Sequence, residues 1–109
     1  MTEAETLEII NHLLNQAGRQ LGVKLDHPSA LEPDEWSNWT WEIEQQEDEP
    51  FIRIKHWKDQ YDFDREDLPV RLPPVLSESE QKEFVKVALD KIDLLRSRST
   101  NPLAESRGV

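Results

Sequence analysis

Cysteine is absent from this 109-residue chain, and glycine and long apolar runs are scarce. Without cysteine the chain has no disulfide, thiolate metal ligand or cysteine nucleophile, and a reducing cytoplasm is the expected setting. Its three glycines, Gly18, Gly22 and Gly108, form no phosphate-binding loop. No apolar run approaches the roughly 20 residues of a membrane-spanning helix, and the first residues are acidic where a signal peptide is basic. We therefore expect a soluble cytoplasmic protein.

Negative charge is concentrated in the middle of the chain. From Asp26 to Asp67 there are 14 acidic residues and four basic ones, so this segment alone accounts for the formal net charge of −10. Such a field repels nucleic acid and anionic lipid and favours basic protein surfaces. We expect a protein partner with a basic surface, no direct contact with nucleic acid, and no membrane.

Aromatic residues gather in the same segment. All four tryptophans, Trp36, Trp39, Trp41 and Trp57, lie within 22 consecutive positions, and seven of the eight aromatic residues lie between positions 36 and 63. Aromatic side chains carry the largest apolar areas, so this segment should supply both much of the core and any binding surface.

Two amphipathic helices are predicted, one near each end of the chain. Residues 2–21 show apolar side chains at helical spacing after a capping box formed by Thr2 and Glu5, with Gly22 as a stop. A second capping box at Ser77 predicts a helix that continues to Arg96.

A β-hairpin is predicted between the helices. Trp39, Trp41 and Ile43 alternate with polar residues, as in a strand that buries one face. A turn over residues 46–50 follows, and residues 51–57 alternate again. In this register the glutamates of the first strand lie near the cations of the second.

The fold class predicted is α+β. A short third strand over residues 60–64 would make the sheet a three-strand meander, and the proline-rich segment 68–76 should form an extended strap. Both helices would then pack on one face of a small antiparallel sheet, in the order α-β-β-(β)-α. Residues 1–96 form the expected single domain, and residues 97–109 an expected disordered tail.

The same element order occurs in double-stranded-RNA-binding domains. Those domains rely on lysine and arginine contacts to phosphate, including the positive start of the final helix. Here that helix begins Ser77-Glu78-Ser79-Glu80. The shared order therefore does not predict RNA binding.

Candidates for chemistry are few. His56, on the predicted inner face and followed by Asp59, could support a small metal-dependent or acid/base enzyme. The acidic run from Asp59 to Asp67 lacks the spacing of a calcium-binding loop, so we interpret it as a solvated acidic loop. No catalytic residue, metal ligand or cofactor is assigned, and the chain is expected not to be an enzyme.

Three aromatic residues fall outside the inward register or at strand ends and are candidates to anchor a partner protein. Tryptophan and tyrosine are enriched at interaction hot spots. With the neighbouring carboxylates, the candidate partner-binding set is Trp36, Trp57, Tyr61, Glu42, Glu44 and Asp59. The function expected is that of a small acidic accessory or regulatory protein that binds another protein through a sheet face or edge.

An alternative function is inhibition by imitation of nucleic acid. Rows of carboxylates could occupy the groove of a DNA- or RNA-binding protein. The residues considered for this role are Glu42, Glu44, Glu47, Asp48 and Glu49.

Overall fold

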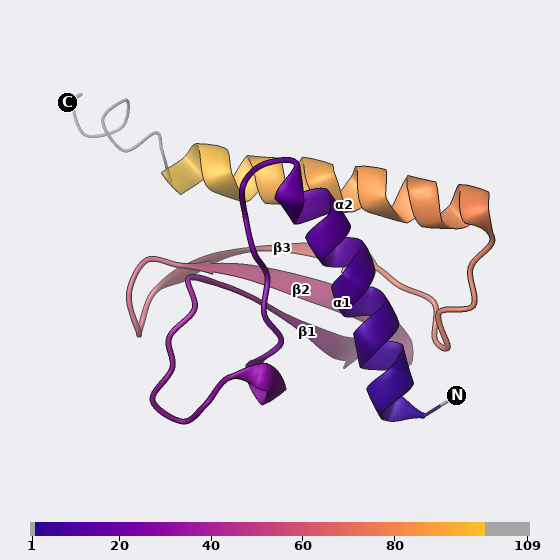
Figure 1. The fold of residues 1–109 in the computed structure, drawn as a ribbon, viewed down its shortest axis with the longest axis horizontal. Coiled ribbons are helices and arrows are strands. Elements are labelled where there is room, and N and C mark those ends of the chain that lie inside the picture. The colour runs from indigo at the N-terminus through magenta and orange to yellow at the C-terminus, as the bar shows by residue number, and fades with distance from the viewer. Residues whose placement is uncertain (1, 100–109) are drawn as a thin grey trace.

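The computed structural model describes residues 2–99 and shows two helices and a three-stranded sheet in the order α-β-β-β-α (Figure 1). The third strand forms, and the predicted α+β fold is confirmed. The elements are α1 (Glu3–Arg19), a short 3₁₀ turn η1 (Pro28–Ala30), β1 (Trp39–Gln46), β2 (Glu49–Trp57), β3 (Phe63–Pro69) and α2 (Glu78–Ser99).

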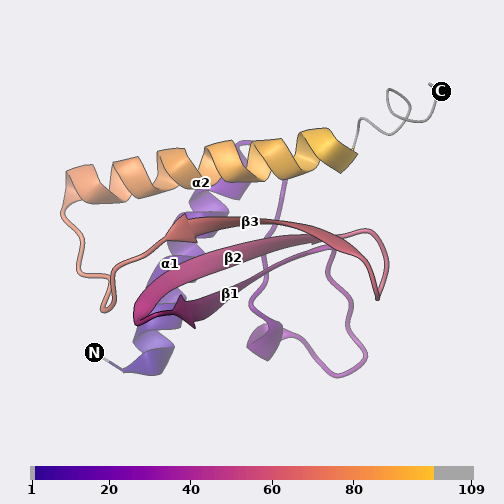
Figure 2. The same ribbon diagram turned by 180° about the vertical axis from the view of Figure 1, so that it is seen from behind.

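Both helices lie on one face of an antiparallel sheet whose strand order is β1-β2-β3 (Figures 1 and 2). In Figure 1, α1 crosses in front of the strands and α2 follows the β3 side. Viewed from behind, the sheet lies in front of α1, and no helix of residues 2–99 covers this second face (Figure 2). The sheet therefore has a helix-side face and an open face.

The core lies between α1, α2 and the helix-side face. Its fully buried members include Leu14 of α1, Trp41 of β1, Ile54 of β2 and Ile92 of α2. Trp39, also predicted to belong to the core, is half-buried and packs at its margin. Each apolar stripe predicted from the sequence thus contributes to one core.

Two asparagines of α1 satisfy polar groups at the edge of this core. The indole Nε1–H of Trp41 donates to Asn11 Oδ1 over 3.0 Å. Asn15 pairs with the backbone of Leu25, since its Nδ2 donates to the Leu25 carbonyl (2.9 Å) and its Oδ1 accepts from the Leu25 N–H (2.8 Å). A buried polar group without such a partner would cost about 1–3 kcal/mol. These bonds tie α1 to β1 and to the connection between them.

Both helices begin at the predicted capping boxes. Glu5 N–H donates to Thr2 Oγ1, and Glu80 N–H donates to Ser77 Oγ, with the reciprocal bonds also present. These backbone hydrogen bonds to carboxylates lower the pKa values of Glu5 and Glu80.

The C-terminal ends of the helices differ from those predicted. α1 ends at Arg19, and the chain turns through Gly22, whose φ of 71° favours glycine. α2 continues to Ser99 rather than Arg96, because Arg98 contacts β3 and holds the last turn against the sheet. Of the expected tail, residues 100–109 lie outside the described residues. Neither helix within residues 2–99 is both long and apolar enough to cross a membrane.

The hairpin turn is shorter than predicted. β1 and β2 pair as far as Gln46 and Glu49, which leaves Glu47 and Asp48 as a two-residue turn. Both have positive φ, 53° and 67°, as a type I′ turn requires. Neither is glycine, so the turn carries backbone strain.

The third strand was misplaced by the sequence analysis. β3 runs over Phe63–Pro69, not over residues 60–64, and it includes most of the acidic run interpreted as a solvated loop. Glu66 forms ion pairs with Lys91 (3.4 Å) and with Arg98 of α2. Burial alone would raise the pKa of Glu66, but hydrogen bonds from these two cations lower it below its usual value. Cations distant in the sequence therefore allow an acidic segment to form a strand beside the core.

Candidate functional site: an aromatic cluster on the open face of the sheet

The strand register assigns every second residue of the sheet to the open face. Residues paired across neighbouring strands share a face, and faces alternate along each strand. The open face therefore carries Thr40, Glu42, Glu44, Phe51, Arg53, Lys55, Trp57, Phe63, Arg65, Asp67 and Pro69.

Three aromatic rings meet at one end of this face, and we refer to Trp36, Trp57 and Phe63 as the aromatic cluster. The Trp57 ring centroid lies 4.6 Å from that of Phe63 and 6.1 Å from that of Trp36, which meets it edge-on at 66°. Trp57 is half-buried and its Nε1–H donates to Thr40 Oγ1 over 2.9 Å. Trp36 covers Trp57 from the β1 side and remains 52% exposed. The cluster therefore has a fixed base, formed by Trp57 and Phe63 on the sheet, and a solvent-exposed outer ring, Trp36.

Lysine 55 fixes the cluster from the middle of the sheet. The Lys55 ammonium lies 4.8 Å from the Phe63 ring centroid and 5.4 Å from that of Trp57. The same nitrogen pairs with Glu42 over 3.0 Å, and the Lys55 side chain is only 16% exposed. A cation above aromatic rings contributes about 0.5–2 kcal/mol, more as water is excluded. Lys55 thus holds Trp57 and Phe63 in place while its own charge is neutralised.

A second cation repeats this arrangement further along the face. Arg53 lies 5.3 Å from the ring centroid of Phe51 and pairs with Asp67 over 3.2 Å. The sequence predicted that Glu42 and Glu44 would lie near the two cations of β2. Glu42 does pair with Lys55, but Arg53 binds Asp67 of β3 instead of Glu44.

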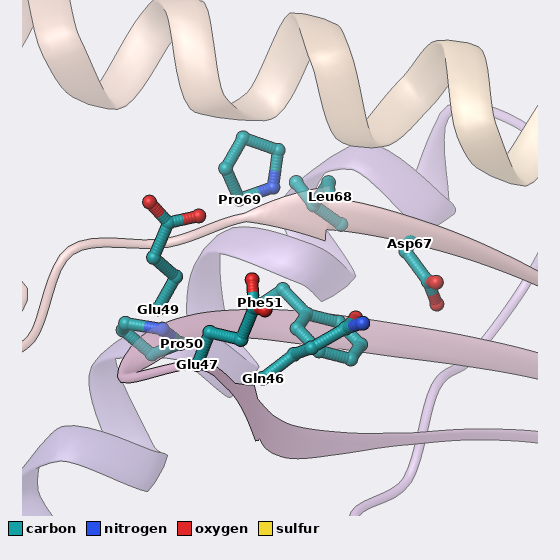
Figure 3. Close-up of a pocket in the computed structure, with 8 residues that line it drawn as sticks. All are labelled: Gln46, Glu47, Glu49, Pro50, Phe51, Asp67, Leu68 and Pro69. Carbon is teal, nitrogen blue, oxygen red and sulfur yellow. The ribbon is translucent and has the colours of Figure 1, made fainter.

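A shallow hollow of about 450 Å³ lies at the other end of the open face (Figure 3). Phe51 and Pro69 lie on β2 and β3, and the carboxylates of Glu47, Glu49 and Asp67 surround them. Its complete lining is Gln46, Glu47, Glu49, Pro50, Phe51, Asp67, Leu68 and Pro69. The open face is therefore aromatic at one end and acidic at the other.

The remaining predicted partner-binding residues occupy different places. Tyr61 is 85% exposed in the β2–β3 loop, which leaves and re-enters the sheet beside Trp57 and Phe63. Asp59 holds that loop, because its Oδ1 accepts from the N–H groups of Tyr61 (2.7 Å) and Asp62 (2.9 Å). The structure thus brings Tyr61 and Asp59 to the same end as the aromatic cluster.

Sequence reasoning missed Phe63 as a member of the aromatic cluster, and missed Lys55 and Thr40 as the residues that hold Trp57. The position of Phe63 depends on its pairing in β3, a strand that was predicted over residues 60–64 but begins at Phe63. Thr40 and Lys55 were placed on the correct face, but nothing in their spacing showed that Trp57 would bind both.

His56, the candidate for acid/base chemistry, lies on the helix-side face instead of the open face. Its ring stacks on Trp39, with centroids 4.0 Å apart and planes 14° apart. Burial lowers the pKa of His56, against the opposing effect of Asp64, while Lys58 lowers it further. The carboxylate of Asp59, its suggested companion, binds backbone N–H groups of its own loop.

The acidic side chains of β3 are divided between the two faces. Asp64 and Glu66 lie on the helix side, and Asp67 on the open face, each beside a cation. Among residues 2–99, no group of three or more histidine and carboxylate side chains is placed to hold a metal ion. In comparisons with protein families, curated proteins and solved structures, nothing matches the chain.

Proposed function

We propose that this chain is a cytoplasmic accessory protein that binds a basic surface of another protein through the open face of its sheet. The observation that carries the proposal is the position of Trp36. This large apolar side chain, in the connection before β1, is about half exposed and rests on Trp57 of the open face, which neither α1 nor α2 covers.

Preorganisation supports this use of the aromatic cluster. Trp57 is fixed by Thr40, Phe63 and Lys55, so little side-chain freedom remains to be lost when a partner binds. Tyr61 extends the apolar surface from the adjacent loop. Tryptophan and tyrosine on a rigid support are the residues that most often dominate binding energy.

The charge around the cluster favours a basic partner. Two of the three cations on the open face are paired, Lys55 with Glu42 and Arg53 with Asp67, and the third, Arg65, is exposed. An approaching surface would also meet the carboxylates of the surrounding loops, such as Glu35 and Asp59, within a segment whose net charge is negative. Complementary charge raises the rate of encounter, whereas the buried aromatic contact sets the lifetime of the complex.

Affinity capture from the host, followed by binding kinetics with each purified candidate, tests the proposal. Trp36→Ala should weaken binding about 30-fold, as expected for loss of a tryptophan hot spot. A matched control is Leu94→Ala on α2, because Leu94 is 48% exposed but lies away from the open face. The control should bind as the unmodified protein does.

Salt separates the two contributions. Raising sodium chloride from about 0.05 M to about 0.5 M should slow association about tenfold and change dissociation little. A partner that binds the Trp36→Ala and Leu94→Ala variants equally well would count against the open face as the binding surface. So would an association rate that does not change with salt concentration.

A further inference from the structure

The outer edge of β1 is only half paired. Along its first half, the connection after α1 forms an isolated parallel β-bridge, in which Asp26 N–H donates to the Trp39 carbonyl (3.1 Å) and Trp41 N–H donates to the Asp26 carbonyl (3.2 Å). The chain then turns away, because Pro28 begins η1. Hydrogen bonding along this edge therefore ends at the Trp41 N–H.

Two further rungs of that ladder are vacant. Backbone groups of alternate residues point to the same side of a strand, so Ile43 and Gln45 face outward as Trp39 and Trp41 do. Within residues 2–99, the N–H and C=O groups of Ile43 and Gln45 have no hydrogen-bond partner. The edge thus offers two donors and two acceptors in the spacing of an added strand.

A groove of about 730 Å³ runs beside these vacant rungs. Its apolar lining comes from Leu7 of α1, Ile43 of β1, and Leu72 and Pro73 of the strap before α2. Its rim carries the carboxylates of Glu3, Glu42 and Glu44, and none of the described residues that line it is a lysine or arginine. The groove is therefore apolar within and negative at its margin.

The opposite edge of the sheet, formed by β3, is partly blocked. The outward carbonyl of Arg65 on β3 accepts a hydrogen bond from Arg98 of α2 over 3.4 Å. At the end of the same strand, Pro69 has no N–H to offer. Proline and crossing side chains are devices that protect edge strands from pairing. The β3 edge is thus partly protected by Arg98 and Pro69.

We propose that the β1 edge binds an extended peptide segment of a partner, with lysine or arginine at alternate positions, as an added strand over Ile43 and Gln45. The vacant rungs bind the peptide backbone, the groove takes the side chains that point toward α1, and Glu44, on the opposite face, pairs with the cations. Strand addition of this kind draws affinity from main-chain bonds and specificity from alternate side chains. The site is separate from the aromatic cluster and does not depend on it.

Charge also decides against a second copy of the chain at this edge. Pairing two β1 strands would bring Glu42 and Glu44 of one molecule close to the same residues of the other. Like charges across a pair of strands are destabilising. With a basic peptide, the electrostatic interaction across the strand pair becomes attractive instead of repulsive.

A synthetic hexapeptide that alternates lysine and valine, acetylated and amidated at its ends, tests the site on the full chain. Amide hydrogen exchange at Ile43 and Gln45 should slow about tenfold or more at saturation, because both N–H groups become bonded. A peptide with glutamate in place of lysine is the matched control and should give no protection. Equal protection by both peptides, or none by either, would overturn the proposal.

Variants at Gln45 separate backbone pairing from simple charge attraction. Gln45→Pro removes one outward N–H at an exposed edge position and should weaken the lysine peptide about tenfold. Gln45→Thr keeps the N–H and should bind within about twofold of the unmodified protein. The two changes binding alike would refute strand addition.

Two further measurements isolate the site. Trp36→Ala should leave binding of the lysine peptide unchanged, so this proposal and the open-face proposal can fail separately. Loss of peptide binding in Trp36→Ala would place the peptide on the open face and overturn the edge site. Protection of Ile43 and Gln45 that rises with protein concentration in the absence of peptide would identify a second copy as the occupant instead.

Discussion

Each face of the sheet carries a hydrogen-bonded tryptophan, but the two tryptophans have different roles. On the helix side, Trp41 is fully buried, and its indole N–H binds a residue of α1. On the open face, Trp57 is half-buried, and its indole N–H binds Thr40 of the neighbouring strand. Both tryptophans have polar partners, but Trp41 joins separate elements of the fold, whereas Trp57 joins residues already held together by the sheet.

This difference predicts which side chain, when removed, lowers the stability of the fold. A residue that connects elements stabilises the fold as a whole, and a residue that connects neighbours on one sheet mainly shapes the surface. The presence of a hydrogen bond by itself would not separate the two tryptophans, because both indole N–H groups have a partner. The identity of their partners does separate them.

Truncating the two tryptophans is the largest test of the comparison. Trp41→Ala should lower the free energy of unfolding by about 3–5 kcal/mol, because it leaves a cavity between α1 and the sheet. Trp57→Ala should cost about 1–2 kcal/mol, since water already reaches part of its surface and the cavity can fill. Urea unfolding followed by far-ultraviolet circular dichroism measures both. Equal losses would mean that the open face belongs to the core.

The hairpin turn offers a smaller change that alters neither face. Asp48→Gly should raise the free energy of unfolding by about 1 kcal/mol, because glycine adopts the positive φ of 67° without strain. The matched control is Gln46→Gly, which places glycine in a strand and should cost about 0.5–1 kcal/mol. Thermal unfolding compares the two. A destabilised Asp48→Gly protein would argue against a positive φ at this position.

The fold was largely predictable because its signals are local. Both capping boxes, the two apolar helix stripes and the alternation around Trp41 depend on residues within a few positions of one another. Gly18 shows where local reasoning stops. Glycine lowers helix propensity, yet a β-carbon at this position would lie 2.5 Å from the carbonyl oxygen of Val23, so the close approach of the following connection requires glycine.

The site was less predictable because its parts meet through pairing. Trp36 and Trp57 could be selected from their position outside the inward register, but their contact depends on the connection before β1. The register of β3 depends on ion pairs between Glu66 and residues of α2 more than 20 positions away. Such contacts leave no periodic pattern in the sequence.

The smallest expected effect is on the pH dependence of stability. Lowering the pH should reduce the contribution of the helix-side face to the free energy of unfolding before it affects the open face. Burial lowers the pKa of His56, with Asp64 opposing and Lys58 adding to the shift. Its ring stacks on Trp39 at the end of the core. The open face, by its register over residues 39–69, carries no histidine. Histidine is the side chain that ordinarily changes its charge between pH 5 and pH 8, so the open face should change little between pH 7 and pH 5.

The sign follows from the lowered pKa. Near and below the usual histidine value of about 6.5, the unfolded chain binds a proton at His56 more readily than the folded protein does, so stability falls as the pH drops through this range. His56→Phe keeps an aromatic ring on Trp39 and removes the titration. From pH 7 to pH 5 the unmodified protein should therefore lose more unfolding free energy than the His56→Phe variant does. Parallel stability curves would show that His56 titrates alike in both states, and acid would then not distinguish the two faces.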